Sequence, residues 1–157
     1  MNISDLLVQV PIFCTLEVEE HAILRESIEQ KRYKPEEFIF EEKDPGDGLY
    51  VIAMGAVRIV KNLDGVNNRT LAGITDLDFF GEMALLDGKP RSAGAVAARD
   101  TVILKLSNEN FNTLMNSNPF IAMKVITQIA CHLAARFRDT NMKLAEAENY
   151  RLLREKK

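Results

Sequence analysis

Between residues 31 and 106, apolar residues come in short runs that are separated by turn signals. The runs are Phe38–Phe40, Leu49–Ala53, Val57–Val60, Leu71–Ile74 and Val102–Leu106. Asp, Gly and Pro mark turns at Asp44–Gly48, Asp64–Gly65 and Asp87–Pro90. Short apolar runs that recur about every ten residues predict the strands of an antiparallel sandwich or barrel. The clearest hairpin loop is Asp64–Asn68, between predicted strands at Ala56–Lys61 and Arg69–Ile74.

Both flanks of this region have helical spacing instead. Residues 1–30 carry a first apolar patch, which Pro11 breaks, and a second with helical spacing: Leu6, Leu7 and Val10, then Val18, Ala22, Ile23 and Ile28. After Ser107 the pattern predicts a short helix at Asn110–Asn116 and a long one beginning at Asn118–Pro119. No Gly or Pro occurs from Phe120 to Lys157, and a helix over that stretch would be about 57 Å long. The sequence therefore predicts a mainly β domain with N-terminal helices and a long C-terminal helix.

Composition and charge fit one globular domain. Of the 157 residues, 46% are apolar and 27% charged, which excludes a disordered tail or a collagen-like rod. The formal net charge of −3 gives no sign of a nucleic-acid surface. Cys14 and Cys131 form no metal-ligand pattern, so we predict reduced thiols and no metal. No apolar run approaches the roughly 18 residues of a membrane span, and no signal peptide is evident, so we predict a cytoplasmic protein without a span.

The segment Phe79–Ala93, FFGEMALLDGKPRSA, interrupts the strand pattern with one predicted helical turn, Glu82–Leu86. The free N–H groups at a helix N-terminus attract a phosphate, and Gly81 lets the backbone approach it closely. Arg91 can supply forked donors to the same anion. Glu82 only accepts hydrogen bonds and therefore suits a sugar hydroxyl. Together these groups predict a pocket for a ribose that bears one phosphate.

The same segment resembles the phosphate-binding cassette of the cyclic nucleotide-binding domain family, and Phe80–Ala93 matches its pattern at every defined position. Asp47–Ile52 and Gly55–Val57 look like the early hairpin of that family, and the resemblance covers about residues 10–145. It implies an antiparallel β-roll or jelly-roll sandwich of the catabolite activator type. It also implies a non-enzymatic domain whose ligand is cAMP or cGMP, with no other cofactor.

Carried over by position, the resemblance assigns the ribose 2′-hydroxyl to Glu82 and the cyclic phosphate to Arg91. The remaining lining residues would be Gly81, Met83, Ala84, Ser92 and Ala93. The alternative for Glu82 and Arg91 is a salt bridge that closes the loop. Lys43 and Leu77 stand where the family often has Gly, which puts the backbone shape of those two turns in question.

The resemblance places the base between the strands and the long helix. Leu71 and Ile74 are expected to form the pocket wall, and Arg136 is expected to stack on the base unless it is simply a solvated helix residue. Ser92 is compatible with cAMP, as in the catabolite activator type, and its hydroxyl leaves cGMP open. We predict a preference for cAMP.

The long helix is predicted to pair with a second copy. A seam of residues three and four apart, Ala130, Leu133, Phe137, Thr140, Leu144 and Ala147, suits a helix pair, although the same side could pack on the sandwich. We expect a binding domain at residues 1–145, with the long helix from about 119, and a charged helical extension at 146–157. Only 15 residues follow Met142, too few for a helix-turn-helix unit, so we expect no DNA binding by this chain.

Two functions follow, and a third is disfavoured. In the first, nucleotide binding shifts the long helix and changes a dimer or partner interface; the partner itself is not predicted. In the second, the domain keeps the fold as a constitutive dimerisation element. An enzyme is not expected: the sequence has no P-loop, G-x-G-x-x-G or H-E-x-x-H, and a phosphodiesterase-like activity would need a metal cluster that it lacks.

Overall fold

The computed structural model describes residues 2–62 and 67–155. Three short N-terminal helices come first: α1 (Ile3–Leu7), the 3₁₀ helix η1 (Pro11–Phe13) and α2 (Val18–Glu26). The strands are β1 (Ile28–Tyr33), β2 (Phe38–Phe40), β3 (Gly48–Met54), β4 (Ala56–Asn62), β5 (Asn68–Thr75), β6 (Phe79–Phe80), β7 (Gly94–Ala97) and β8 (Thr101–Ser107). Helix α3 (Glu82–Asp87) lies between β6 and β7, and α4 (Asn108–Ser117) and α5 (Pro119–Glu155) close the chain.

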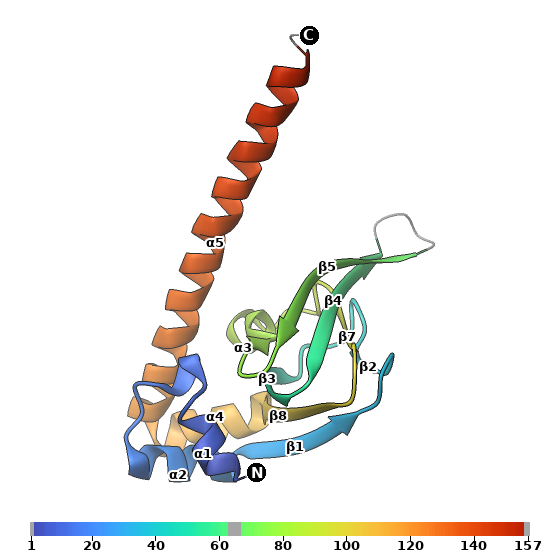
Figure 1. The fold of residues 1–157 in the computed structure, drawn as a ribbon. Coiled ribbons are helices and arrows are strands. Elements are labelled where there is room, and N and C mark those ends of the chain that lie inside the picture. The colour runs from blue at the N-terminus through green and yellow to red at the C-terminus, as the bar shows by residue number, and fades with distance from the viewer. Residues whose placement is uncertain (1, 63–66, 156–157) are drawn as a thin grey trace.

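Within these described residues the strands form two antiparallel sheets of four, with orders β1-β8-β3-β6 and β2-β7-β4-β5. The sheets face each other, and the N-terminal helices, α4 and the start of α5 gather at one end of the sandwich, as Figure 1 shows. The predicted fold class, an antiparallel sandwich with N-terminal helices and a long C-terminal helix, is confirmed.

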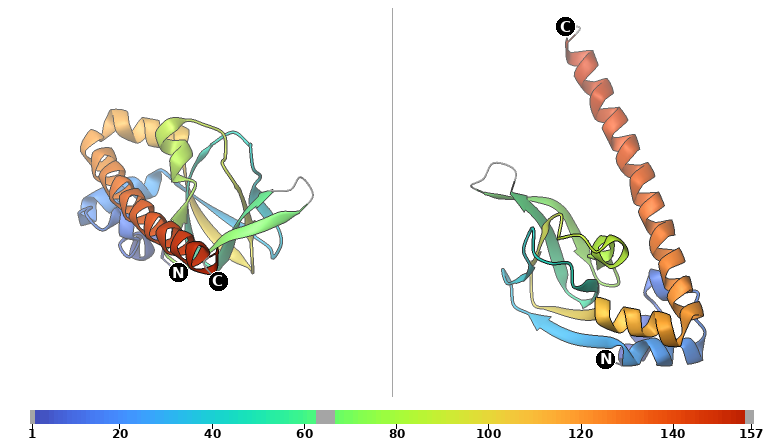
Figure 2. Two further views of the ribbon diagram at one scale, coloured as in Figure 1. Left: turned by 90° about the horizontal axis from the view of Figure 1, so that it is seen from above. Right: turned by 180° about the vertical axis from the view of Figure 1, so that it is seen from behind.

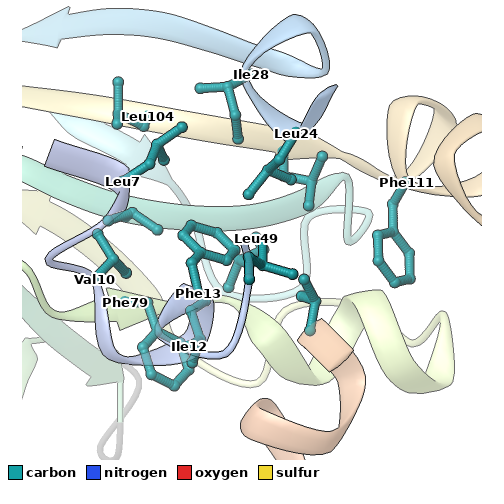
Figure 3. Close-up of a cluster of buried hydrophobic side chains, with 14 of the residues drawn as sticks. Leu7, Val10, Ile12, Phe13, Leu24, Ile28, Leu49, Phe79, Leu104 and Phe111 are labelled. Atoms are coloured by element: carbon teal, nitrogen blue, oxygen red, sulfur yellow. The ribbon is translucent and has the colours of Figure 1, made fainter. Parts of the chain in front are cut away.

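Strand β3 is buried on both faces, which explains why its sequence is a continuous apolar run. Leu49, Val51 and Ala53 belong to the cluster beneath the helices, whereas Tyr50 and Ile52 belong to the cluster between the sheets. In the first cluster the side chains of the N-terminal helices meet β3 and β8, as drawn in Figure 3. The helical end and the sandwich are therefore packed as one unit.

Helix α5 is longer than the body it packs on. It has 37 residues, about 55 Å, and only its first third is buried, at Ile121, Ala122, Val125 and Ile129. From Ala134 onward the described side chains are exposed, and Figure 1 and the right-hand view of Figure 2 show the helix leaving the sandwich. By length and composition alone, one helix of the described residues, Pro119–Arg151, could cross a membrane, a test that core helices also pass. The absence of a membrane span therefore stays a prediction.

Three sequence expectations need correction or completion. Ile28 was expected in a helix, but β1 begins there and pairs with β8 from Ile28↔Leu106 to Tyr33↔Thr101. The backbone hydrogen bonds of that pairing outweigh a weak helical pattern, because this segment has few apolar residues of its own. The short strands β6 and β7 were not predicted. Most of the predicted hairpin loop Asp64–Asn68 lies outside the described residues, although β4 and β5 pair beside it at Asn62↔Asn68.

Candidate functional site

Helix α3 is placed by glycines at both ends. Gly81 before it and Gly88 after it have φ of 76° and 65°, a left-handed conformation that favours glycine. The loop before β3 also touches α3 closely, because a Cβ on Gly46 would lie 2.2 Å from the Cβ of Ala84. The predicted single turn is confirmed, and it is seated against the β3 end of the sandwich.

Arg91 lies under this turn with 4% of its surface exposed. Its Nη1 donates to the Gly81 carbonyl at 3.0 Å, and its Nη2 donates to Asp47 at 2.7 Å and to the Gly48 carbonyl at 2.9 Å. The guanidinium carbon is 4.1 Å from the centroid of the Phe40 ring. Nε is buried and has no partner among the described residues. A buried cation with an unused donor is suited to receive an anion.

Asp47 joins three donors. Its Oδ1 accepts from Arg91 and from the Tyr50 hydroxyl at 2.7 Å, and its Oδ2 accepts from Lys105 Nζ at 2.5 Å. Partial burial raises the pKa of Asp47, but the hydrogen bonds from Lys105, Tyr50 and Arg91 outweigh it and lower the pKa from 3.8 to about 2. Burial and the neighbouring carboxylate raise the pKa of Tyr50 well above its ordinary value. Asp47 is therefore ionised and holds Arg91 in place.

Glu82 faces the long helix. It is 6% exposed, and its Oε1 accepts from Arg136 Nη1 at 3.1 Å. Arg136 Nη2 donates to the Phe79 carbonyl at 3.2 Å, and its guanidinium lies 4.8 Å from the Phe79 ring centroid. The alternative salt bridge between Glu82 and Arg91 is not formed. Arg136 therefore contacts the cassette through Glu82 and Phe79, while its side chain stays 45% exposed.

A cavity of about 350 Å³ opens between α3, the loop after it and α5. It is lined by six of the predicted binding residues and by Arg136: Gly81, Glu82, Met83, Ala84, Arg91 and Ser92. Ala93 is not among the lining residues, and neither are Leu71 and Ile74. Leu71 is half exposed on β5, and Ile74 packs on the cluster between the sheets. Ile59 and Phe80 supply apolar lining instead.

Two charged residues beneath the cavity, Asp47 and Lys105, were missed, and Asp87 and Lys89, which line it, were predicted only as turn residues. Asp47 was noticed only as part of a hairpin, and Lys105 received no role. The available signal was the position of Lys105, the only charged residue of the run Thr101–Ser107, since a buried strand rarely carries an unpaired lysine. Asp47, directly before the apolar run of β3, offered the opposite charge.

A two-sheet sandwich with a buried arginine under a short helix is the framework of a domain that could bind a small anion. The particular family follows from its sequence model. The cyclic nucleotide-binding domain model matches residues 30–118, more than half of the chain, and the chain belongs to that family.

Individual relatives agree with this assignment. The chain is 36% identical over 134 residues to the cyclic AMP receptor protein of Thermus thermophilus, covering 85% of this chain and 60% of the receptor. It is 34% identical over 110 residues to a cAMP-dependent protein kinase regulatory subunit of Aspergillus niger, covering 69% of this chain and 26% of the subunit. The chain thus spans 60% or less of these two relatives. Their names describe a receptor and a regulatory subunit, in agreement with the non-enzymatic prediction.

Solved structures give the same result. A cyclic nucleotide-binding domain from Methylobacillus flagellatus KT superposes with a TM-score of 0.79 at 28% identity, over 90% of this chain and 79% of that one. The catabolite activator protein of Thermus thermophilus gives a TM-score of 0.75 at 36% identity, over 85% of this chain and 61% of that one. Both support the predicted family and fold.

Proposed function

We propose that this chain binds a cyclic nucleoside monophosphate in the cavity beside α3, with cAMP preferred to cGMP. The observation that carries the proposal is that Arg91 lines this cavity and has a buried Nε–H with no partner among the described residues. The phosphate would receive this donor and the backbone N–H groups that follow Gly81, and Ser92 would add a hydroxyl. Met83 and Ala84, which also line the cavity, keep their proposed roles, as does Arg136 toward the base. Ala93, Leu71 and Ile74 do not line this cavity, and their roles stay predictions.

We propose further that Glu82 couples the ligand to α5. Its Oε1 holds Arg136, and no partner of its Oε2 is found among the described residues. A ribose 2′-hydroxyl that donates to Oε2 would share the same carboxylate with the helix. Ligand binding and the position of α5 would then be linked, since each changes the strength of the other contact.

We propose that ligand binding shifts α5 and thereby changes an interface that α5 forms in a cytoplasmic homodimer. Leu133 packs partly on its own core, whereas Phe137 and Leu144 are each 67% exposed. The free part of the seam is therefore the part beyond the sandwich, which favours pairing with a second copy. We retain the proposed division into a binding domain at 1–145 and a helical extension at 146–157.

The test is calorimetric titration with cAMP and with cGMP, followed by sizing with and without ligand. We expect saturable binding, tighter for cAMP, and a loss of about 10²–10³ in affinity in Arg91→Ala, because the buried phosphate loses its cation. Arg32→Ala, which removes an exposed cation on β1, is the matched control and should bind normally. A wild type that gives no heat at millimolar ligand would support the constitutive dimerisation element instead.

A further inference from the structure

Lys105 is a buried cation that makes no direct contact with the cavity. It lies on β8 with 8% of its surface exposed, and it is absent from the lining of the site. Its ammonium binds Asp47 Oδ2 at 2.5 Å and lies 5.6 Å from the centroid of the Tyr50 ring. Burying a lysine is costly even when it is paired with a carboxylate, because desolvation can exceed the gain from the pair. The position of Lys105 beside the partner of Arg91 therefore calls for a physical reason.

The reason lies in the charges beneath the cassette. Asp47 orients Arg91, but a carboxylate at 2.7 Å also cancels the positive charge that an anionic ligand would meet. Lys105 binds the other oxygen of the same carboxylate. With Asp47 at −1 and the two cations at +1 each, the group has a formal charge of +1. Without Lys105 that charge would be zero.

We propose that Lys105 is a positioning residue of the ligand site, and this inference rests on the proposed function. It acts through Asp47: the carboxylate can anchor Arg91, while Asp47, Arg91 and Lys105 together keep a formal charge of +1. That charge matches the single negative charge of a phosphodiester. Lys105 therefore sets the electrostatic complementarity of the site without touching the ligand.

Charge-swapped variants test this separately from packing. Lys105→Gln lowers the group to zero, and we expect cAMP binding to weaken about tenfold in calorimetric titration. Lys105→Arg keeps the charge and should stay within about threefold of wild type. The double variant Asp47→Asn with Lys105→Gln returns the group to +1 with a neutral hydrogen-bonding pair, and should bind more tightly than Lys105→Gln alone.

The outcomes are distinct. If Lys105 had only a structural role, the losses of cAMP affinity from the two substitutions would add, and the double variant would bind more weakly than Lys105→Gln. That result, or unchanged binding in Lys105→Gln, would overturn the inference and leave the proposed function standing. If Lys105→Gln does not fold, the folded double variant decides: binding within about threefold of wild type supports the inference, and a larger loss rejects it. A wild type without nucleotide binding would overturn the proposed function, and this inference with it.

Discussion

Lys43 shows how a residue can depart from its family pattern without changing the backbone. It stands where glycine is common, yet its φ is 73°, in the left-handed region. The turn is held by its contacts with the cassette: Lys43 N donates to the Arg91 carbonyl at 2.9 Å, and Arg91 N donates to the Asp44 carbonyl at 2.8 Å. Leu77 has the same conformation, with φ of 67°. Lys43 and Leu77 therefore adopt the backbone conformation that glycine commonly has in these two turns, and the backbone is strained at both residues.

Lys43→Gly should accordingly stabilise the fold. The left-handed conformation costs a non-glycine residue about 1–2 kcal/mol, and the added freedom of the unfolded chain returns part of that gain. We expect the free energy of unfolding, measured by urea denaturation, to rise by about 0.5–1 kcal/mol. Lys43→Ala keeps the strain and should show no such rise. Equal stability of the Gly and Ala variants would contradict the explanation.

Asp47 predicts a dependence of stability on pH. Its pKa is lowered from 3.8 to about 2 in the folded state, so the ionised form is favoured by folding. That contribution is fully present above pH 3.8 and is lost as the pH falls toward 2. Because the side chain is 48% exposed, solvent screening reduces it to roughly 1 kcal/mol.

The check is urea denaturation of the wild type and Asp47→Asn at several pH values from 6 to 2. The difference between the two free energies of unfolding should narrow by about 1 kcal/mol below pH 4, since only the wild type has a carboxylate at position 47 to protonate. A constant gap would show that Asp47 is not held ionised by its neighbours.

At the scale of the element, α3 requires glycine at Gly81. A Cβ there would lie 2.6 Å from Arg91 Nη1, and the φ of 76° is unfavourable for any side chain. We expect Gly81→Ala to displace Arg91, to weaken cAMP binding at least tenfold and to destabilise the fold by about 1–3 kcal/mol. Gly73→Ala on β5 is the matched control, since nothing lies within 4 Å of its Cβ. Normal binding by Gly81→Ala would rule out this account of the turn.

Helix α5 should lose its link to the ligand in Arg136→Ala. The phosphate contacts remain, so we expect cAMP to bind within about tenfold of wild type. Hydrogen exchange of α5 beyond Ala134 should change with cAMP in the wild type and in Arg138→Ala, but not in Arg136→Ala. A ligand-dependent change that persists in Arg136→Ala would place the coupling elsewhere.

The helices and strands also show which features could be predicted from the sequence. The cassette was predicted because its residues are neighbours along the chain, and so were the strands with long apolar runs. Strand β1 was missed because Ile28 is its only buried residue, and its pairing partner β8 lies more than 60 residues away. The contact of Lys105 with Asp47 joins positions 58 apart, and that of Arg136 with Glu82 joins positions 54 apart. Local chemistry was readable, whereas pairings made by the fold were not.

For the whole molecule, the part of α5 beyond the sandwich is the feature that its own core does not explain. Most helical stability in proteins comes from packing of an apolar face, which the sandwich does not provide for this segment, and i,i+4 pairs such as Asp139–Lys143 add only about 0.3–0.5 kcal/mol. Phe137 and Leu144, seven positions apart on one face, would instead bury their side chains against the same residues of a second copy.

Phe137→Ser combined with Leu144→Ser should therefore separate the dimer. Each buried apolar side chain contributes about 1.5–3 kcal/mol, so we expect the dimer Kd to rise at least a hundredfold in sedimentation equilibrium. Met142→Ser, an equally exposed apolar residue outside the seam, should leave the dimer intact. The folded sandwich should be unaffected, because all three side chains lie on the exposed part of α5. A wild type that stays monomeric at the highest concentration measured, or a double variant that still dimerises, would mean that this helix pairs through another face or not at all.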